Sequence, residues 1–325
     1  MLEPQRTNTI PYSEYQSGGG FTLGSNITWN GFVESPEGVN NASRFTSNVQ
    51  GFSYVAPQGV VIPSGDFTFS MWVRGVSGTF LNRPLNIAGL SGTSLVYMNE
   101  TPVAGEDWKL VYGTGNNTGS AVTKTITLPF YDQPVNSVLD IYGFQLEAGS
   151  YATSYIPTYG SSVSRVGETC TDAGTAATFN STEGVLYLEI EALSDDSTNR
   201  WISISQDSDI NANQLNFRYA AASNLIQVVS RANGLGQDVV LQHTLSDETS
   251  FNKIAVKYKL NDWALWVNGV EVDTETSSTA FTANSLDVLD FHRGNQSNFF
   301  YGKTKQILVF TTALSDAELA TLTTI

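Results

Sequence analysis

The 325-residue chain carries 31 Asp and Glu against 16 Lys and Arg, which gives a formal net charge of −15. This balance, with no basic cluster, excludes nucleic-acid binding and attraction to an anionic membrane surface, because both need concentrated positive charge. Hydrophobic residues are 41% and charged residues 14%, enough apolar material for packed cores, and the length favours two domains.

The chain begins with a polar stretch, residues 1–20, which contains two prolines and Gly18-Gly19-Gly20 and is typical of an extended arm. Short predicted strands fill residues 21–149. The segment 67–74 alternates cleanly, so we expect Trp72 and Arg74 on the face opposite the core. No helix is predicted between these strands, which indicates a sandwich or jelly roll.

The segment 138–147 is predicted as the last strand of the first domain. Simple alternation puts Asp140, Tyr142, Phe144 and Leu146 on one face of it. Gly149 and Pro157 then end the strand pattern, and the polar run after Pro157 is typical of a linker over residues 150–179.

A second β-domain is predicted over residues 180–325, again from short alternating strands. Asn268-Gly269 is the strongest hairpin signal in the chain, because this dipeptide tolerates the positive φ angles of a tight turn. Ser315 and Glu318 form a capping box before an apolar face, so one short helix is expected at the C-terminus.

Nearly the whole chain resembles a known group of proteins. The segments 2–14 and 143–158 are similar to the start and end of a carbohydrate-binding-module-like jelly roll in bacteriophage tail-fibre and other virion proteins. The segments 251–258, 266–270 and 300–304 are similar to a concanavalin A-like (laminin G-like) domain of the same phage proteins. The resemblance implies an all-β fold of two serial antiparallel sandwiches, a viral context and homotrimeric assembly.

The spacings that predict catalysis are missing. The two histidines, His243 and His292, are far apart, and no HExxH, CxxC, GxSxG or phosphate-binding glycine loop occurs. Concanavalin A-like domains include glucanases, which need two carboxylates beside the scissile bond. The nearest run, Glu189 to Ser194, has Ser194 where the third acid belongs, so we expect no enzyme activity.

Glycan binding is the better chemical hypothesis, because sugar rings stack on exposed aromatic side chains and their hydroxyls need polar partners. The polar loop 292–298 precedes an apolar run, and loops at the ends of sandwiches often carry ligand contacts. The candidate glycan-binding residues are Trp72, Arg74, Trp266, His292, Arg293 and Asn295.

No cofactor is predicted. A structural calcium ion is the one metal considered, because jelly-roll and laminin G-like domains hold calcium with Asp, Asn and backbone oxygens. Asp207, Asp209 and Asn211 form the candidate run, which is equally typical of a solvated turn.

We therefore expect a non-enzymatic virion protein, from a tail fibre, spike or capsid-surface fibre, that attaches by binding a host-surface or environmental glycan. It would be made in the host bacterial cytoplasm and assemble with other virion proteins. We expect no membrane insertion, because the sequence has no stretch of about twenty apolar residues and no secretory signal. The first alternative is a purely structural assembly module, and the second is a polysaccharide-degrading glycoside hydrolase.

Overall fold

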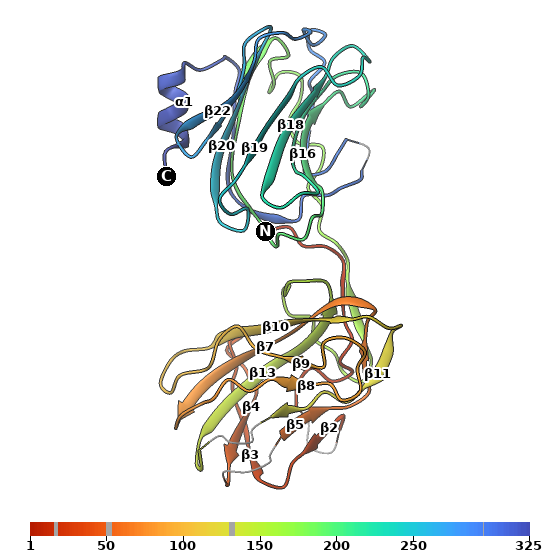
Figure 1. The fold of residues 1–325 in the computed structure, drawn as a ribbon, viewed down its shortest axis with the longest axis vertical. Coiled ribbons are helices and arrows are strands. Elements are labelled where there is room, and N and C mark those ends of the chain that lie inside the picture. The colour runs from red at the N-terminus through yellow and green to blue at the C-terminus, as the bar shows by residue number, and fades with distance from the viewer. Residues whose placement is uncertain (16–18, 50–53, 130–133, 295) are drawn as a thin grey trace. The chain divides into compact units, whose positions relative to one another are not determined.

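The computed structural model describes residues 1–15, 19–49, 54–129, 134–294 and 296–325. Nearly all of its regular structure is strand, and the chain divides into two compact units (Figure 1). Residues Gln5–Val166 form the first sandwich, and Met1–Pro4 with Gly167–Ile325 form the second. The predicted fold class, two antiparallel β-sandwiches in series with one short C-terminal helix, is confirmed.

These units have other boundaries than the predicted domains. Residues 5–15 do not form a separate arm, since β1 (Arg6–Asn8) pairs with β14 (Val163–Arg165) inside the first unit. The buried Asn8 amide donates to the carbonyl oxygens of Phe144 (3.1 Å) and Ile156 (2.9 Å). These hydrogen bonds tie the N-terminal segment and much of the predicted linker to the first sandwich.

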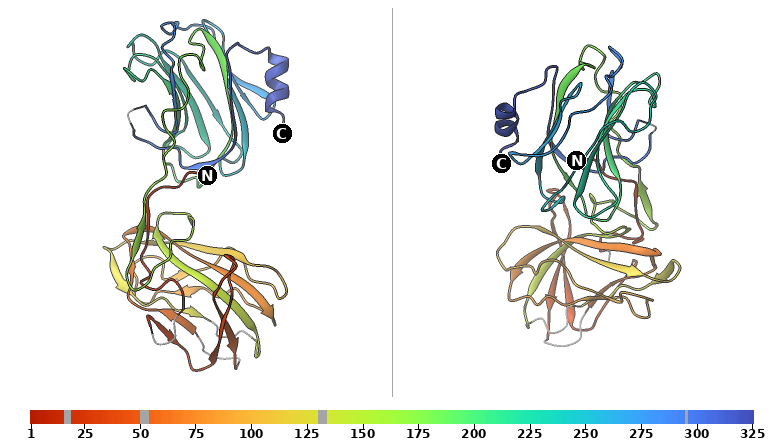
Figure 2. Two further views of the ribbon diagram at one scale, coloured as in Figure 1. Left: turned by 180° about the vertical axis from the view of Figure 1, so that it is seen from behind. Right: turned by 45° about the horizontal axis from the view of Figure 1, so that its top comes forward.

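The first sandwich has one long sheet and a layer of short strands facing it (Figure 2). The long sheet consists, in order, of β10 (Lys109–Asn117), β7 (Gly65–Ser77), β13 (Val138–Ala148), β4 (Asn40–Ser47) and β3 (Ile27–Glu34). The facing layer consists of β12 (Leu128–Pro129), β5 (Tyr54–Pro57), β2 (Phe21–Leu23), β11 (Val122–Lys124), β6 (Val60–Ile62), β8 (Leu85–Asn86) and β9 (Leu95–Val96). Apolar side chains from both layers meet in one core.

Strand β13 does not alternate as its sequence predicts. Leu139 and Ile141 point into the core, but so do Phe144 and Leu146. A β-bulge between Tyr142 and Gln145 shifts the pairing with β7, and Gly143 has a φ of 68° there. The extra residue switches the face on which later side chains lie, so Asp140 and Phe144 lie on opposite faces.

The second sandwich consists of two five-stranded antiparallel sheets around a large apolar core. One sheet has the order β22 (Val270–Glu275), β21 (Trp263–Val267), β20 (Asn252–Lys259), β15 (Glu183–Ala192), β24 (Gly302–Phe310). The other has the order β19 (Val240–Thr244), β18 (Leu225–Arg231), β17 (Gln214–Tyr219), β16 (Arg200–Ser205), β23 (Val288–Asp290).

The local signals in this sandwich are confirmed. Asn268 and Gly269 have φ angles of 50° and 88° in the turn between β21 and β22. Helix α1 (Asp316–Thr323) begins at the capping box, in which the Ser315 N–H donates to Glu318 Oε2 (2.8 Å). In the described part of the chain, no helix has the length and apolarity needed to cross a lipid bilayer.

Glu248 makes the stability of the second sandwich depend on pH. Its carboxyl is buried and lies near Asp195, Asp196 and Arg200. Burial, with Asp195 as the next cause, raises the pKa of Glu248 from 4.5 to about 7, although Arg200 opposes this. The folded chain therefore binds a proton that the unfolded chain loses near pH 4.5, so stability falls as pH rises from 4.5 through 7.

We expect the unfolding temperature of the second sandwich to be lower at pH 8 than at pH 5. Glu248→Gln removes the titrating group and should flatten this dependence. Calorimetry of the native sequence and of Glu248→Gln at pH 5 and pH 8 measures the unfolding temperatures. An equal pH dependence in the two proteins would refute this role of Glu248.

Candidate functional site

The outer face of the sheet β19-β18-β17-β16-β23 is the candidate functional site. In β16, Ile202 and Ile204 point into the core, so Trp201, Ser203 and Ser205 lie on the outer face. The residues of β17 paired with these three, Arg218, Asn216 and Gln214, are polar, and Gln227 and Arg231 of β18 continue two of the rows. The middle row continues instead with Val229 and Val240. Ser203, Ser205, Gln214 and Asn216 are buried, whereas Arg218, Gln227 and Gln242 are at least partly exposed.

Four side chains form a row across this face, which we call the polar row: Trp201, Arg218, Gln227 and Gln242. The pairing of β16 to β19 places each directly opposite the next. The Gln227 amide donates to Gln242 Oε1 (3.1 Å). Gln227 Oε1 in turn accepts hydrogen bonds from Arg218 Nε (2.9 Å) and from Arg218 Nη2. The Arg218 guanidinium carbon lies 4.7 Å from the ring centre of Trp201. The row thus joins an indole, a guanidinium and two amides.

A second guanidinium lies over the same indole. Arg293 follows β23, and its guanidinium carbon lies 5.2 Å from the ring centre of Trp201. The backbone N–H of Arg293 donates to the Ser297 carbonyl oxygen (2.9 Å), which fixes the start of the loop. Each guanidinium can gain a cation–π interaction with the indole, but their positive charges repel each other.

The arginines on this face have no acidic partner. Among the described residues, no carboxylate lies within salt-bridge distance of Arg218, of Arg293 or of Arg231, which is also on the outer face. Arg200, by contrast, pairs with Asp196 at 2.7 Å. Burial, with the positive charge of Arg293 as the second cause, lowers the pKa of the Arg218 guanidinium.

Three buried polar atoms on this face also lack a hydrogen-bond partner within the described ranges: Trp201 Nε1, Ser205 Oγ and Asn216 Oδ1. Trp201 is 6% exposed, Asn216 2% and Ser205 0%. Buried polar groups are nearly always hydrogen-bonded, so three exceptions on one sheet face are unusual. Because all three atoms are closed to solvent, a ligand on this face would contact the partly exposed side chains of the polar row and not these atoms.

The structure brings only part of the predicted loop to this site. Arg293 lies at the polar row. His292 is buried, its Nδ1 lies 2.7 Å from the Arg293 carbonyl oxygen, and its ring packs against Phe299, so no ring face is open to a ligand. Asn295 lies outside the described residues.

Trp72 and Arg74 lie on the outer face of the first sandwich's long sheet, as alternation predicts. Arg74 is removed from the candidates because its guanidinium pairs with the buried carboxylate of Asp140 (2.9 Å). Trp72 is half-buried between its cross-strand neighbours Leu110 and Tyr142. Sugar binding by Trp72 stays a prediction.

Trp266 is also removed from the candidates. It is 8% exposed and belongs to an apolar cluster with Tyr187 and Leu319 of α1. Figure 1 shows α1 alongside the sheet that contains β20 and β22. With the helix in place, neither face of the indole is free to stack on a sugar.

The calcium candidates make one local turn contact and one contact with a residue distant in the sequence. Asp209 Oδ1 accepts from the Asn211 N–H (3.0 Å), and the Asp207 N–H donates to Asp287 Oδ1 (2.8 Å). Within the described ranges, no three His, Cys, Asp or Glu side chains are grouped so that they could hold a metal ion. A structural calcium at this run stays a prediction.

The two carboxylates considered for glycoside hydrolysis are both paired with lysines of β24. Glu191 Oε1 lies 2.6 Å from Lys303 Nζ, and Glu189 Oε1 lies 3.4 Å from Lys305 Nζ. A glycosidase instead needs its two carboxyl groups on either side of a bound sugar. The geometry gives the enzyme alternative no support.

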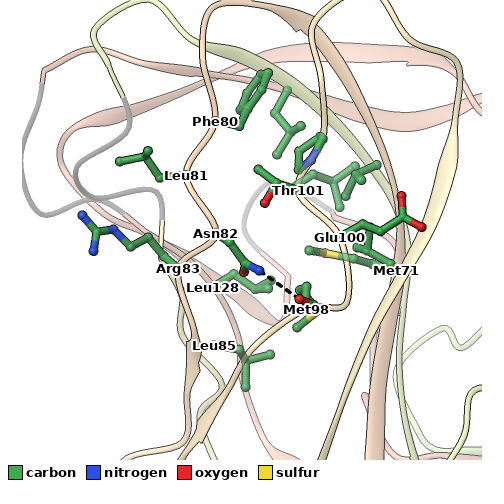
Figure 3. Close-up of a pocket in the computed structure, with 15 residues that line it drawn as sticks. Met71, Phe80, Leu81, Asn82, Arg83, Leu85, Met98, Glu100, Thr101 and Leu128 are labelled. Atoms are coloured by element: carbon green, nitrogen blue, oxygen red, sulfur yellow. Dashed lines mark hydrogen bonds between the residues drawn. The ribbon is translucent and has the colours of Figure 1, made fainter.

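A cavity in the first sandwich is a weaker candidate (Figure 3). Its walls are mainly apolar side chains of the core and the adjoining loops, among them Met71, Leu85 and Met98. The Asn82 amide donates to the Met98 carbonyl oxygen (2.9 Å) across it. Its volume, about 70 Å³, is far below the roughly 300 Å³ at which small-molecule sites begin. We regard it as an opening in the core.

Sequence reasoning missed most of the polar row. The apolar residues Leu215 and Phe217 already place Arg218 outward, and Ile226 does the same for Gln227. What the sequence does not contain is the register that lines these residues up beside Trp201.

Comparison with known proteins locates one similarity in the second sandwich. Residues 175–320 match the model of the concanavalin A-like lectin/glucanases superfamily. No curated protein matches the chain.

Solved structures similar to the chain include three that share low sequence identity with it. The CBM40 of Ruminococcus gnavus IT-sialidase is 16% identical, covering 49% of this chain and 97% of its own, with a TM-score of 0.38. Mouse laminin alpha1 domains LG4-5 are 11% identical, covering 82% and 90%, with a TM-score of 0.30. Sheep galectin-11 is 8% identical, covering 44% and 94%, with a TM-score of 0.30.

Proposed function

We propose that this chain is a non-catalytic glycan-binding protein and that the outer face of the sheet β19-β18-β17-β16-β23 is its binding surface. The polar row carries the proposal: it sets amide and guanidinium groups in line beside an indole. Sugar hydroxyls need such donors and acceptors. The match of residues 175–320 to a superfamily of lectins and glucanases supports the same class of ligand.

We further propose that the protein acts in a bacteriophage virion, in a tail fibre, spike or capsid-surface fibre, and attaches to a host-surface or environmental glycan. The resemblance of segments in both sandwiches to phage fibre proteins supports this setting. Synthesis in the host bacterial cytoplasm, assembly with other virion proteins and a homotrimeric state belong to the same proposal. Mass spectrometry of separated heads and tails from purified particles tests it, and absence from every particle fraction would refute it.

Glycan binding is tested first with the full chain on an array of bacterial envelope and capsule glycans. Gln227→Ala should weaken binding of the best ligand by about tenfold, as expected for losing direct hydrogen bonds. Gln306→Ala is the matched control, because Gln306 is an exposed glutamine on the opposite sheet. Isothermal titration calorimetry measures both variants.

No binding to any glycan would refute the proposal and favour a purely structural assembly module. The burial of Trp266 beneath α1 is the observation that fits this alternative. Release of reducing ends from a polysaccharide, abolished by Glu189→Gln or Glu191→Gln, would instead establish a hydrolase.

A further inference from the structure

We propose that the ligand is an acidic glycan and that Arg218 and Arg293 together hold its sugar carboxylate. This inference rests on the proposed function, because it names the class of glycan that the same face would select. Its basis is the convergence of two guanidiniums on the indole of Trp201, neither of which has an acidic partner among the described residues.

The two arginines come from separate parts of the second sandwich. Arg218 is held in the middle of the sheet by β17, and its Nε and Nη2 both donate to Gln227 Oε1. Arg293 reaches the same indole from the loop after β23. In the described part of the chain, the Arg293 guanidinium makes no hydrogen bond, so all of its N–H donors are free.

Electrostatics favour an anion at this place. Two like charges on one ring destabilise each other, and a carboxylate near both would turn that repulsion into two charge-assisted hydrogen bonds. The chain contains 31 acidic side chains, yet none pairs with Arg218 or Arg293 among the residues described. The lowered pKa of Arg218 has the charge of Arg293 as its second cause, which agrees with this uncompensated repulsion.

The surroundings favour a sugar acid over other anions. The amides of Gln227 and Gln242 continue the row away from the arginines and offer partners for hydroxyl groups. A planar carboxylate matches the fork of a guanidinium. The negative charge of the chain, −15 in total, would repel a densely sulfated or phosphorylated polymer. A sparsely charged glycan that bears carboxylates therefore fits best.

The test uses the full chain and an array on which each uronic-acid or sialic-acid glycan is printed beside its carboxyl-reduced, neutral counterpart. We expect binding to the acidic glycans and an affinity at least about tenfold lower for their carboxyl-reduced counterparts. Arg218→Gln and Arg293→Gln should each weaken the acidic ligand by a similar factor. Lys124→Gln, which removes one positive charge from the first sandwich, should leave the affinity for the acidic ligand unchanged.

The outcomes separate the two proposals. Neutral glycans that bind as well as acidic ones, with no effect of either arginine variant, would overturn this inference and leave glycan binding standing. No binding to any glycan would remove both proposals. Binding of an acidic peptide without any glycan would also overturn the inference, since it would assign the arginine pair to a protein partner. Calorimetric unfolding of each variant verifies that it is folded.

Discussion

Asp140→Asn should lower the free energy of unfolding of the first sandwich by about 3 kcal/mol, the range found when one partner of a buried ion pair is removed. The Asp140 side chain is 0% exposed and lies between two arginines. Arg44 contacts it at 2.7 Å and 2.9 Å, and Arg74 at 3.1 Å and 2.9 Å. The amide of asparagine would leave two guanidiniums facing each other without a counter-charge.

Calorimetry of the full chain measures this effect as a downward shift of one unfolding transition. Glu100→Gln is the control in the same sandwich, because Glu100 is 52% exposed in its pair with Lys109 and exposed pairs contribute little. Equal unfolding temperatures for Asp140→Asn and Glu100→Gln would contradict the stabilising role of the Asp140 cluster. The cluster also explains why Arg74, although it points outward, is committed to the fold.

The long strand β13 shows where sequence reasoning stops. The pattern correctly predicts a strand that closes the first sandwich, because local apolar content decides that a strand forms. It wrongly puts Phe144 on the same face as Asp140, because a bulge at Gly143 shifts the alternation. A β-bulge depends on how two strands pair, and this pairing is not encoded within one strand.

Sequence signals that depend on neighbouring residues alone predicted the structure correctly, whereas strand pairing could not be predicted. Asn268-Gly269 and the Ser315–Glu318 capping box were both found in the sequence, because each depends on neighbouring residues only. The outward side of Arg218 could also be predicted from its own strand. That Arg218 lies beside Trp201 and opposite Gln227 depends on the register of three strands, so the site could be recognised only from the structure.

Leu319→Ala should destabilise the second sandwich by about 3 kcal/mol, within the range for truncating a fully buried leucine. Leu319 is 0% exposed and lies in one apolar cluster with Tyr187 and Trp266 of the sheet, against which Ala320 and Leu322 of α1 also pack. The helix has eight residues, too few to be stable alone in water, so tertiary packing must hold it. Loss of this contact should release α1 from the sheet before the sandwich itself unfolds.

The fluorescence of Trp266 reports this release separately from global unfolding. Its indole is 8% exposed beneath the helix, so water that reaches it should shift its emission to longer wavelength. We expect this shift in Leu319→Ala and not in a double variant that also carries Trp266→Phe, which identifies Trp266 as its source. Thr321→Ala is the control, since Thr321 is an exposed residue of the same helix. An unchanged emission in Leu319→Ala, with stability equal to that of Thr321→Ala, would show that Leu319 does not hold the helix.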